Sequence, residues 1–188
     1  AICVIEVGVM PVPFKDLTSD QDSGVAGYLT FVDEEDDKGI QGALFLVSSR
    51  GAPLDYCFTR VDVHNTFLWR QGDARRNAVT ALARVLFEGT SRTPDLILSL
   101  ADEVPPRVFA DDLAVNVPLC RISTGDVTVQ GASETSETLG ASVNVVWATN
   151  QPSPDSGARK LLEALLDRQL LREPFERAAL GLEEAFRT

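Results

Sequence analysis

Three short apolar runs followed by one amphipathic run form the most regular part of this sequence. The apolar runs are rich in aromatic and β-branched residues, and they are Tyr28–Val32, Ala43–Ser48 and Leu54–Val63. The first connection is acidic and ends at Gly39, and the second contains Gly51 and Pro53, which suit a tight turn. We therefore expect three strands in an antiparallel meander.

The amphipathic run follows Gly72 and Asp73. Its apolar residues recur at helical spacing and are Val79, Leu82, Ala83 and Leu86. Asp73 suits an N-cap, and Gly89 suits the end of the helix. The pattern predicts one long helix after the meander.

The remaining segments predict further strands and a helical C-terminus. The expected strands are Ile2–Met10, Leu96–Leu100, Leu113–Ile122, and a pair formed by Asp126–Gln130 and Val143–Thr149. The polar segment Gly131–Gly140 is expected to be a mobile loop. Two helices are expected at the end of the chain, one opened by Pro154-Asp155-Ser156 and one by Pro174, and their apolar stripes should pack on the sheet.

The order of these elements predicts an α/β or α+β fold in one globular domain, 1–188. A mixed sheet with one main helix should occupy 1–150, and the C-terminal helices 151–188 should pack on it. At least one face of the sheet should be covered by helices. The middle strand of the meander is apolar on both faces, so we expect it to be buried on both.

Composition bears on which partners the protein can bind and on its location in the cell. The formal charge is −11, which disfavours extensive contact with nucleic-acid phosphates. No apolar run is long enough to span a membrane. The three cysteines, Cys3, Cys57 and Cys120, have neither disulfide-framework nor zinc spacing, which favours a reducing, cytoplasmic location.

No strong catalytic motif is present. His64 is the only histidine, no G-x-S-x-G pattern occurs, and the Gly24–Gly27 segment precedes a strand instead of a helix. We therefore expect that the protein uses no cofactor and has no enzymatic activity.

The most distinctive surface candidate lies before and within the first turn of the long helix. It consists of large apolar residues and arginines, namely Phe67, Leu68, Trp69, Arg70, Arg75 and Arg76. Aromatic residues and arginine are enriched in protein interfaces, so the leading prediction is a non-catalytic interaction or assembly subunit that binds a protein partner or itself. The three arginines could instead bind a small anionic ligand, or form ion pairs with the protein's own surplus carboxylates.

A second prediction comes from three antiparallel strands, a helix and a buried strand in that order. This arrangement is similar to the core of ribonuclease H-like nucleases, in which strand-end carboxylates hold Mg²⁺ or Mn²⁺. The resemblance implies Asp33 and Asp102 as metal ligands, with Glu103 beside them as a further catalytic candidate. The alternative function is thus a divalent-metal-dependent nuclease.

Overall fold

The computed structural model describes most of the chain. The described residues are 5–9, 24–34, 39–63, 68–70, 72–105, 107–123, 134–140 and 142–187. The strands are β1 (Ile5–Val9), β2 (Val25–Asp33), β3 (Gly39–Ser48), β4 (Pro53–Asp62), β5 (Leu96–Leu100), β6 (Leu119–Ser123), β7 (Thr135–Leu139) and β8 (Val143–Trp147). The helices are α1 (Asp73–Gly89), the π-helical turn η3 (Val108–Asp112), α2 (Gly157–Asp167) and α3 (Glu173–Ala185).

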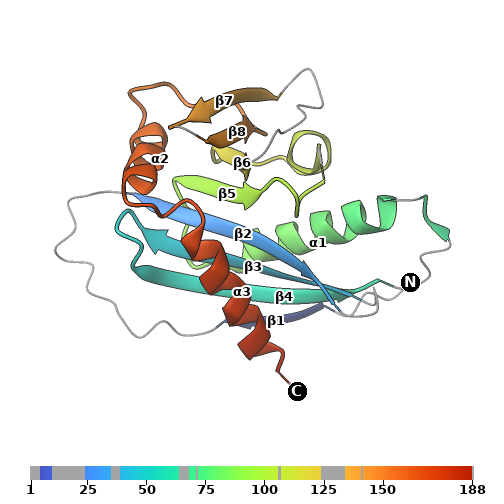
Figure 1. Ribbon diagram of the computed structural model, residues 1–188. Coiled ribbons are helices and arrows are strands. Elements are labelled where there is room, and N and C mark those ends of the chain that lie inside the picture. The colour runs from blue at the N-terminus through green and yellow to red at the C-terminus, as the bar shows by residue number, and fades with distance from the viewer. Residues whose placement is uncertain are drawn as a thin grey trace.

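The strands form one mixed sheet in the order β1-β4-β3-β2-β5-β6-β8-β7 (Figure 1). β1, β4, β3 and β2 are antiparallel neighbours. β5 lies parallel to β2 and β6 lies parallel to β5, whereas β8 and β7 continue the sheet in antiparallel pairs. The predicted mixed sheet, begun by a β-meander, is confirmed.

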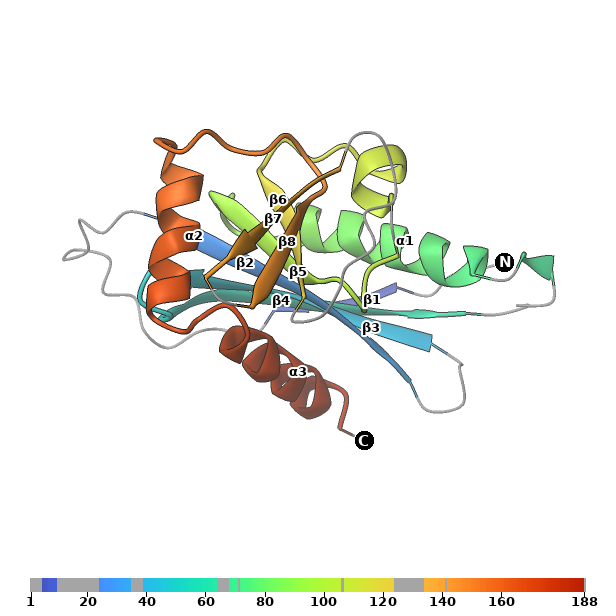
Figure 2. The same cartoon turned by 45° about the horizontal axis from the view of Figure 1, so that its top comes forward.

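Helices lie on both faces of the sheet (Figure 2), and the described residues form an apolar core on each face. On one face, α1 and η3 pack on the sheet, with the predicted residues Val79, Leu82, Ala83 and Leu86 all buried. On the other face, α2 and α3 cover the sheet. Burial of apolar side chains on both faces explains why almost every position of β3 is inaccessible to solvent.

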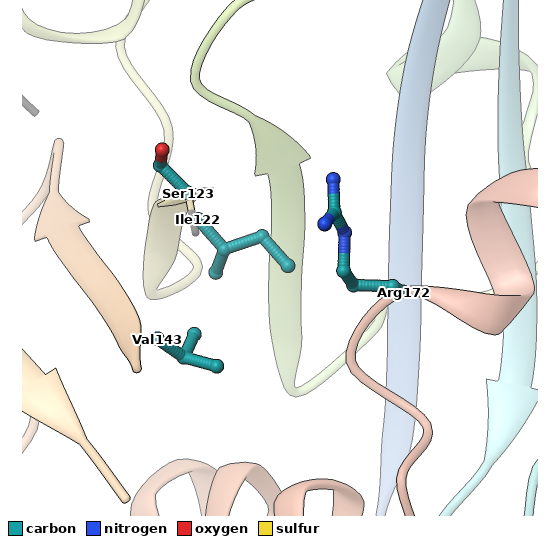
Figure 3. A pocket seen from close by; sticks show the side chains of 4 residues that line it. All are labelled: Ile122, Ser123, Val143 and Arg172. Atoms are coloured by element: carbon teal, nitrogen blue, oxygen red, sulfur yellow. The ribbon is translucent and has the colours of Figure 1, made fainter. Parts of the chain in front are cut away.

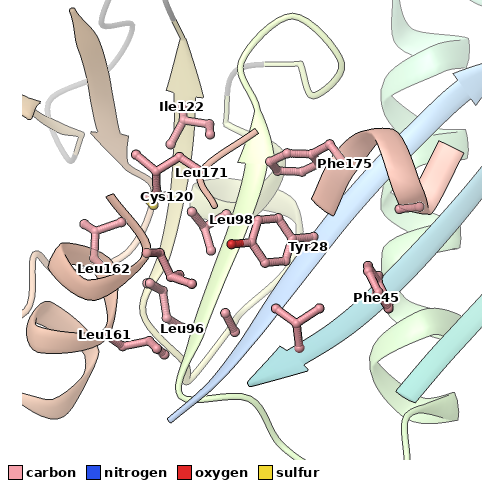
Figure 4. Close-up of a cluster of buried hydrophobic side chains, with 14 of the residues drawn as sticks. Tyr28, Phe45, Leu96, Leu98, Cys120, Ile122, Leu161, Leu162, Leu171 and Phe175 are labelled. Carbon is pink, nitrogen blue, oxygen red and sulfur yellow. The ribbon is translucent and has the colours of Figure 1, made fainter. Parts of the chain in front are cut away.

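The core beneath α2 and α3 is built around Tyr28 (Figure 4). The Tyr28 ring meets Phe175 of α3 edge to face, with 5.0 Å between the ring centroids. Its hydroxyl donates to the Leu170 carbonyl at 2.6 Å. The connection between α2 and α3 is therefore fixed to the sheet by a hydrogen bond that sits within an apolar core.

Several sequence expectations need correction. Of the predicted strand Leu113–Ile122, only the residues from Leu119 onward form a strand, which continues to Ser123, because Pro118 has no N–H to donate to a ladder. The predicted loop Gly131–Gly140 contains edge strand β7, whose polar residues are tolerated because it lies at the margin of the sheet. The N-cap of α1 is Gly72, at φ +87°, and not Asp73. The predicted strand Asp126–Gln130 lies outside the described residues.

In the part of the chain that the structure describes, we find no helix that combines the length and the apolar character needed to cross a bilayer.

Candidate nucleic-acid interface

The carboxyl ends of β2 and β5 meet at one edge of the sheet, beside the first turn of α1. β2 ends at Asp33, and β5 ends at Leu100 and is followed by a turn that contains Asp102 and Glu103. The two strands are parallel, so both carboxyl ends lie at the same edge, the usual position of ligand sites in open α/β sheets. We call this region, with the first turn of α1 and η3, the β2–β5 edge.

Arg75 connects the separate parts of this edge. One guanidinium nitrogen, Nη1, forms a short ion pair with Oδ1 of Asp33. The other, Nη2, donates to the main-chain carbonyl of Glu103 at 2.9 Å. A single side chain from α1 thus joins the end of β2 to the turn after β5.

The Glu103 carboxylate has a structural role in this arrangement. It accepts hydrogen bonds from the Thr30 hydroxyl at 2.7 Å and from the Phe31 N–H at 2.9 Å. The parallel pairing of β2 with β5 ends at Leu29 and Ser99. The Phe31 N–H lies just beyond the end of this ladder, and the Glu103 carboxylate accepts its hydrogen bond in place of a strand carbonyl. Burial raises the pKa of Glu103, although these hydrogen bonds oppose the shift, and the nearby Asp102 charge adds to it.

Arg76 fixes the other side of the same helical turn. Its guanidinium binds both carboxylate oxygens of Asp112 in η3, with Nη2 to Oδ1 at 2.7 Å and a shorter bond from Nε to Oδ2. Asp111 lies 3.9 Å from the same guanidinium. The alternative in which Arg75 and Arg76 pair with the protein's own carboxylates is the arrangement that the structure shows.

Leu68 and Trp69 project into solvent next to this edge. Leu68 is 73% exposed and Trp69 is 47% exposed, and Arg70 is exposed as well. The Arg70 carbonyl accepts a hydrogen bond from the Asp73 N–H at 3.0 Å, which holds the segment against the start of α1. Phe67 and His64 lie outside the described residues.

The predicted metal ligands do not form a cation site in this arrangement. Mg²⁺ and Mn²⁺ need several oxygen donors that converge on one point. Asp33 is paired with Arg75, and the Glu103 carboxylate is used by Thr30 and Phe31. Across the described ranges, no three Asp, Glu, His or Cys residues are grouped so that they could hold a metal ion.

Two cavities lie elsewhere. One of about 10 Å³ is lined by Ile122, Ser123, Val143 and Arg172 (Figure 3), and it has room for about one water molecule. The other, of about 180 Å³, lies between the end of α1 and the start of β5, with Phe87, Pro94 and Ile97 among its lining residues. No charged side chain lines this second cavity, and its polar lining residues are Thr90, Thr93 and Asn116.

Comparison with known proteins identifies the fold. No family model and no curated protein sequence matches the chain. Among solved structures, endonuclease V from Streptomyces avermitilis superposes with a TM-score of 0.59 at 15% identity, covering 87% of this chain and 83% of that one. Endonuclease V from Bacillus subtilis gives a TM-score of 0.50 at 11% identity, covering 86% and 79%. The chain shares the ribonuclease H-like fold of these proteins, as the order of its elements predicted.

This likeness corrects two predictions. The leading prediction, a non-catalytic interaction or assembly subunit, is wrong, because the structures that share the fold are nucleases and favour the nuclease alternative. The net charge of −11 was also given too much weight when nucleic acid was disfavoured as a partner. Net charge describes the whole surface, whereas a nucleic acid contacts only one part of it.

Sequence reasoning identified most residues of the edge but not their contacts. The sequence places Arg75 and Arg76 in the first turn of a helix, where cations are unfavourable, and this position alone indicates that other groups offset their charge. The offsetting partners are Asp33 and Asp112, which are far away in the sequence. Thr30 was missed, since a single threonine in a strand gives no sign that it will bind a distant carboxylate.

Proposed function

We propose that the protein acts on nucleic acids and that the β2–β5 edge is the surface that binds them. The observation that carries this proposal is the shared fold with two endonuclease V structures, together with the arginines gathered at the edge where ligands bind in such sheets. We also propose a cytoplasmic location, which is the location expected from the spacing of the cysteines.

The start of α1 is suited to a phosphate group. Gly72 has no side chain with which to cap the helix, and the Asp73 N–H donates to the Arg70 carbonyl at 3.0 Å, so the N–H groups of Ala74 and Arg75 are those that lack a side-chain cap. The helix dipole adds partial positive charge at this end, and Arg75 and Arg76 add two full charges. Although Asp33 and Asp112 balance these arginines, a phosphate can share the remaining guanidinium donors.

Trp69 and Leu68 supply apolar surface for bases. An exposed aromatic ring next to a phosphate-binding position is the usual arrangement in proteins that bind single strands, where bases stack on it. Arg70, between the ring and the helix, adds a further exposed cation. Bases would therefore contact the segment before α1 while the backbone contacts its first turn.

Binding of fluorescein-labelled oligonucleotides, measured by fluorescence anisotropy, tests the proposal. Wild-type protein should bind single-stranded DNA or RNA, and Trp69→Ala should weaken binding by about tenfold, as expected for the loss of one stacked base. Leu180→Ala is the matched control, because Leu180 is also an exposed apolar residue, at 61%, but lies on α3 on the opposite face. Equal affinity of wild type and Trp69→Ala, or no binding at all, would contradict the proposal.

The nuclease form of this function is tested in the same samples. Oligonucleotides are incubated with Mg²⁺ or Mn²⁺, and cleavage is compared between wild type and Asp102→Asn. Cleavage that is lost in the variant would support Asp102 as an acting residue. Binding without cleavage would leave recognition of nucleic acid as the activity of this edge.

A further inference from the structure

The contact between Arg75 and Asp33 conflicts with the metal chemistry that the fold suggests. Nucleases of this fold class use strand-end carboxylates to hold a divalent cation, and Asp33 is the strand-end carboxylate of β2. Its positive partner is instead a guanidinium that comes from the protein itself. Arg75 is further fixed by its bond to the Glu103 carbonyl at 2.9 Å.

The other carboxylates of the edge, Glu103 and Asp102, do not replace Asp33 as ligands of a cation. One oxygen of the Glu103 carboxylate, Oε2, accepts hydrogen bonds from both Thr30 and Phe31, and this orients the side chain toward β2. Asp102 is exposed in the turn after β5. A cation at Asp33 would lie next to the Arg75 charge, and like charges at that distance repel each other strongly.

We propose that Arg75 takes the place of a divalent cation at the β2–β5 edge. It neutralises Asp33 and joins β2 to the turn after β5, the two tasks that a bridging ion would perform. The edge then binds nucleic acid without loading a metal ion, a statement that rests on the proposed function. Oligonucleotide affinity should accordingly be the same in EDTA as in Mg²⁺ at matched ionic strength.

Binding of Mn²⁺, followed by electron paramagnetic resonance of the free ion, tests the substitution directly. Arg75→Gln removes the charge and leaves the Asp33 carboxylate without its cationic partner, so Mn²⁺ should associate with this variant about tenfold more tightly than with wild type. Arg84→Gln is the matched control, since Arg84 is an exposed arginine of the same helix away from the edge. The double variant Arg75→Gln/Asp33→Asn should return to the wild-type affinity, because the freed carboxylate is gone.

Equal Mn²⁺ affinity of wild type and folded Arg75→Gln would overturn the inference. If circular dichroism shows that Arg75→Gln does not fold, Asp33→Asn decides the question in an otherwise wild-type protein. Wild type and Asp33→Asn should bind Mn²⁺ equally weakly, and weaker binding by Asp33→Asn would show that wild type already loads an ion there. Failure to bind any oligonucleotide would instead contradict the proposed function. Oligonucleotide binding is measured separately, by fluorescence anisotropy, so the two failures can be distinguished.

Discussion

Arg121 and Glu134 form an ion pair that is almost completely removed from solvent. Their side chains are 3% and 1% exposed, and the Arg121 Nη2 lies 3.0 Å from both carboxylate oxygens. The Arg121 Nε has no hydrogen-bond partner among the described residues. Such a pair offsets the cost of removing two charges from water only while both partners are present.

Removal of one partner of this pair should therefore be more harmful than removal of both. Glu134→Ala should lower the free energy of unfolding by about 3–5 kcal/mol, because it leaves a buried guanidinium unpaired. The double variant Arg121→Met/Glu134→Leu should recover most of that loss. Urea unfolding followed by circular dichroism measures both, and a double variant as unstable as the single one would show that the pair itself is needed.

Asp55 is a buried carboxylate whose ionised form is held by hydrogen bonds. Its Oδ2 accepts from the Ser91 N–H at 3.0 Å and from the Ser91 hydroxyl at 2.5 Å, and its Oδ1 accepts from the Tyr56 N–H at 2.9 Å. Burial alone would raise the pKa of Asp55, but these bonds outweigh it and lower the pKa below the ordinary value of 3.8.

A depressed carboxylate pKa stabilises the folded state above the unfolded-state pKa, and this contribution is lost as the pH falls through the lower, folded-state value. Asp55→Ala should thus cost about 1–3 kcal/mol near neutral pH, since it leaves the Ser91 N–H without its partner. The difference between wild type and variant should shrink as the pH falls below 3.8. Thermal unfolding over a pH series measures it, and a difference independent of pH would contradict this account.

At the scale of elements, helix α3 depends on close contact with β4. The Tyr56 hydroxyl donates to the Ala178 carbonyl at 2.7 Å, and a Cβ added at Gly181 would lie 2.6 Å from the Tyr56 hydroxyl oxygen. Gly181 is therefore required for the helix to approach the strand, although glycine lowers the intrinsic stability of a helix.

Gly181→Ala should destabilise the protein by about 1–3 kcal/mol, because the new methyl group displaces a buried tyrosine. Gly157→Ala is the control within α2, where an added Cβ would meet nothing within 4 Å, and it should be neutral or slightly stabilising. Differential scanning calorimetry distinguishes the two variants. A similar shift in both would indicate a general effect of helix propensity and not the contact with Tyr56.

Elements with a strong local pattern could be predicted from the sequence, and elements defined by distant contacts could not. The meander and α1 follow from apolar periodicity and turn residues, so their positions agree closely with the prediction. β7 was missed because its five residues are largely polar, and only pairing with β8 makes them a strand. The π-helical turn η3 has no sequence signal of its own, and Arg76 contacts it from α1.

At the scale of the whole molecule, the negative net charge extends to the β2–β5 edge, where Asp33, Asp111 and Asp112 pair with Arg75 and Arg76. The chain carries a net charge of −11, while the segment before α1 presents exposed Arg70 beside Trp69. The sequence indicated these residues as a binding surface, but it could not identify the partner, since aromatic residues and arginine suit protein and nucleic-acid partners alike. The order of the elements indicated a nuclease as the alternative, and the fold shared with two endonuclease V structures favours that alternative over a protein partner.

Nucleic-acid binding at this surface should be sensitive to salt. Affinity should fall between about 50 and about 200 mM salt, and Arg70→Gln should reduce the slope of log affinity against log salt by about 0.7–0.9 if it removes one phosphate contact. Arg187→Gln is the control, because Arg187 is an exposed arginine, with its side chain 75% accessible, after the end of α3. Identical slopes for wild type and Arg70→Gln would remove Arg70 from the interface.

Hydrogen–deuterium exchange with and without a saturating oligonucleotide reports whether nucleic acid binds at the β2–β5 edge. We predict slower amide exchange in the segment before α1, in the first turn of α1 and in the turn after β5, with no change in α3. Protection confined to α3, or no protection anywhere while the oligonucleotide is bound, would contradict binding at this edge.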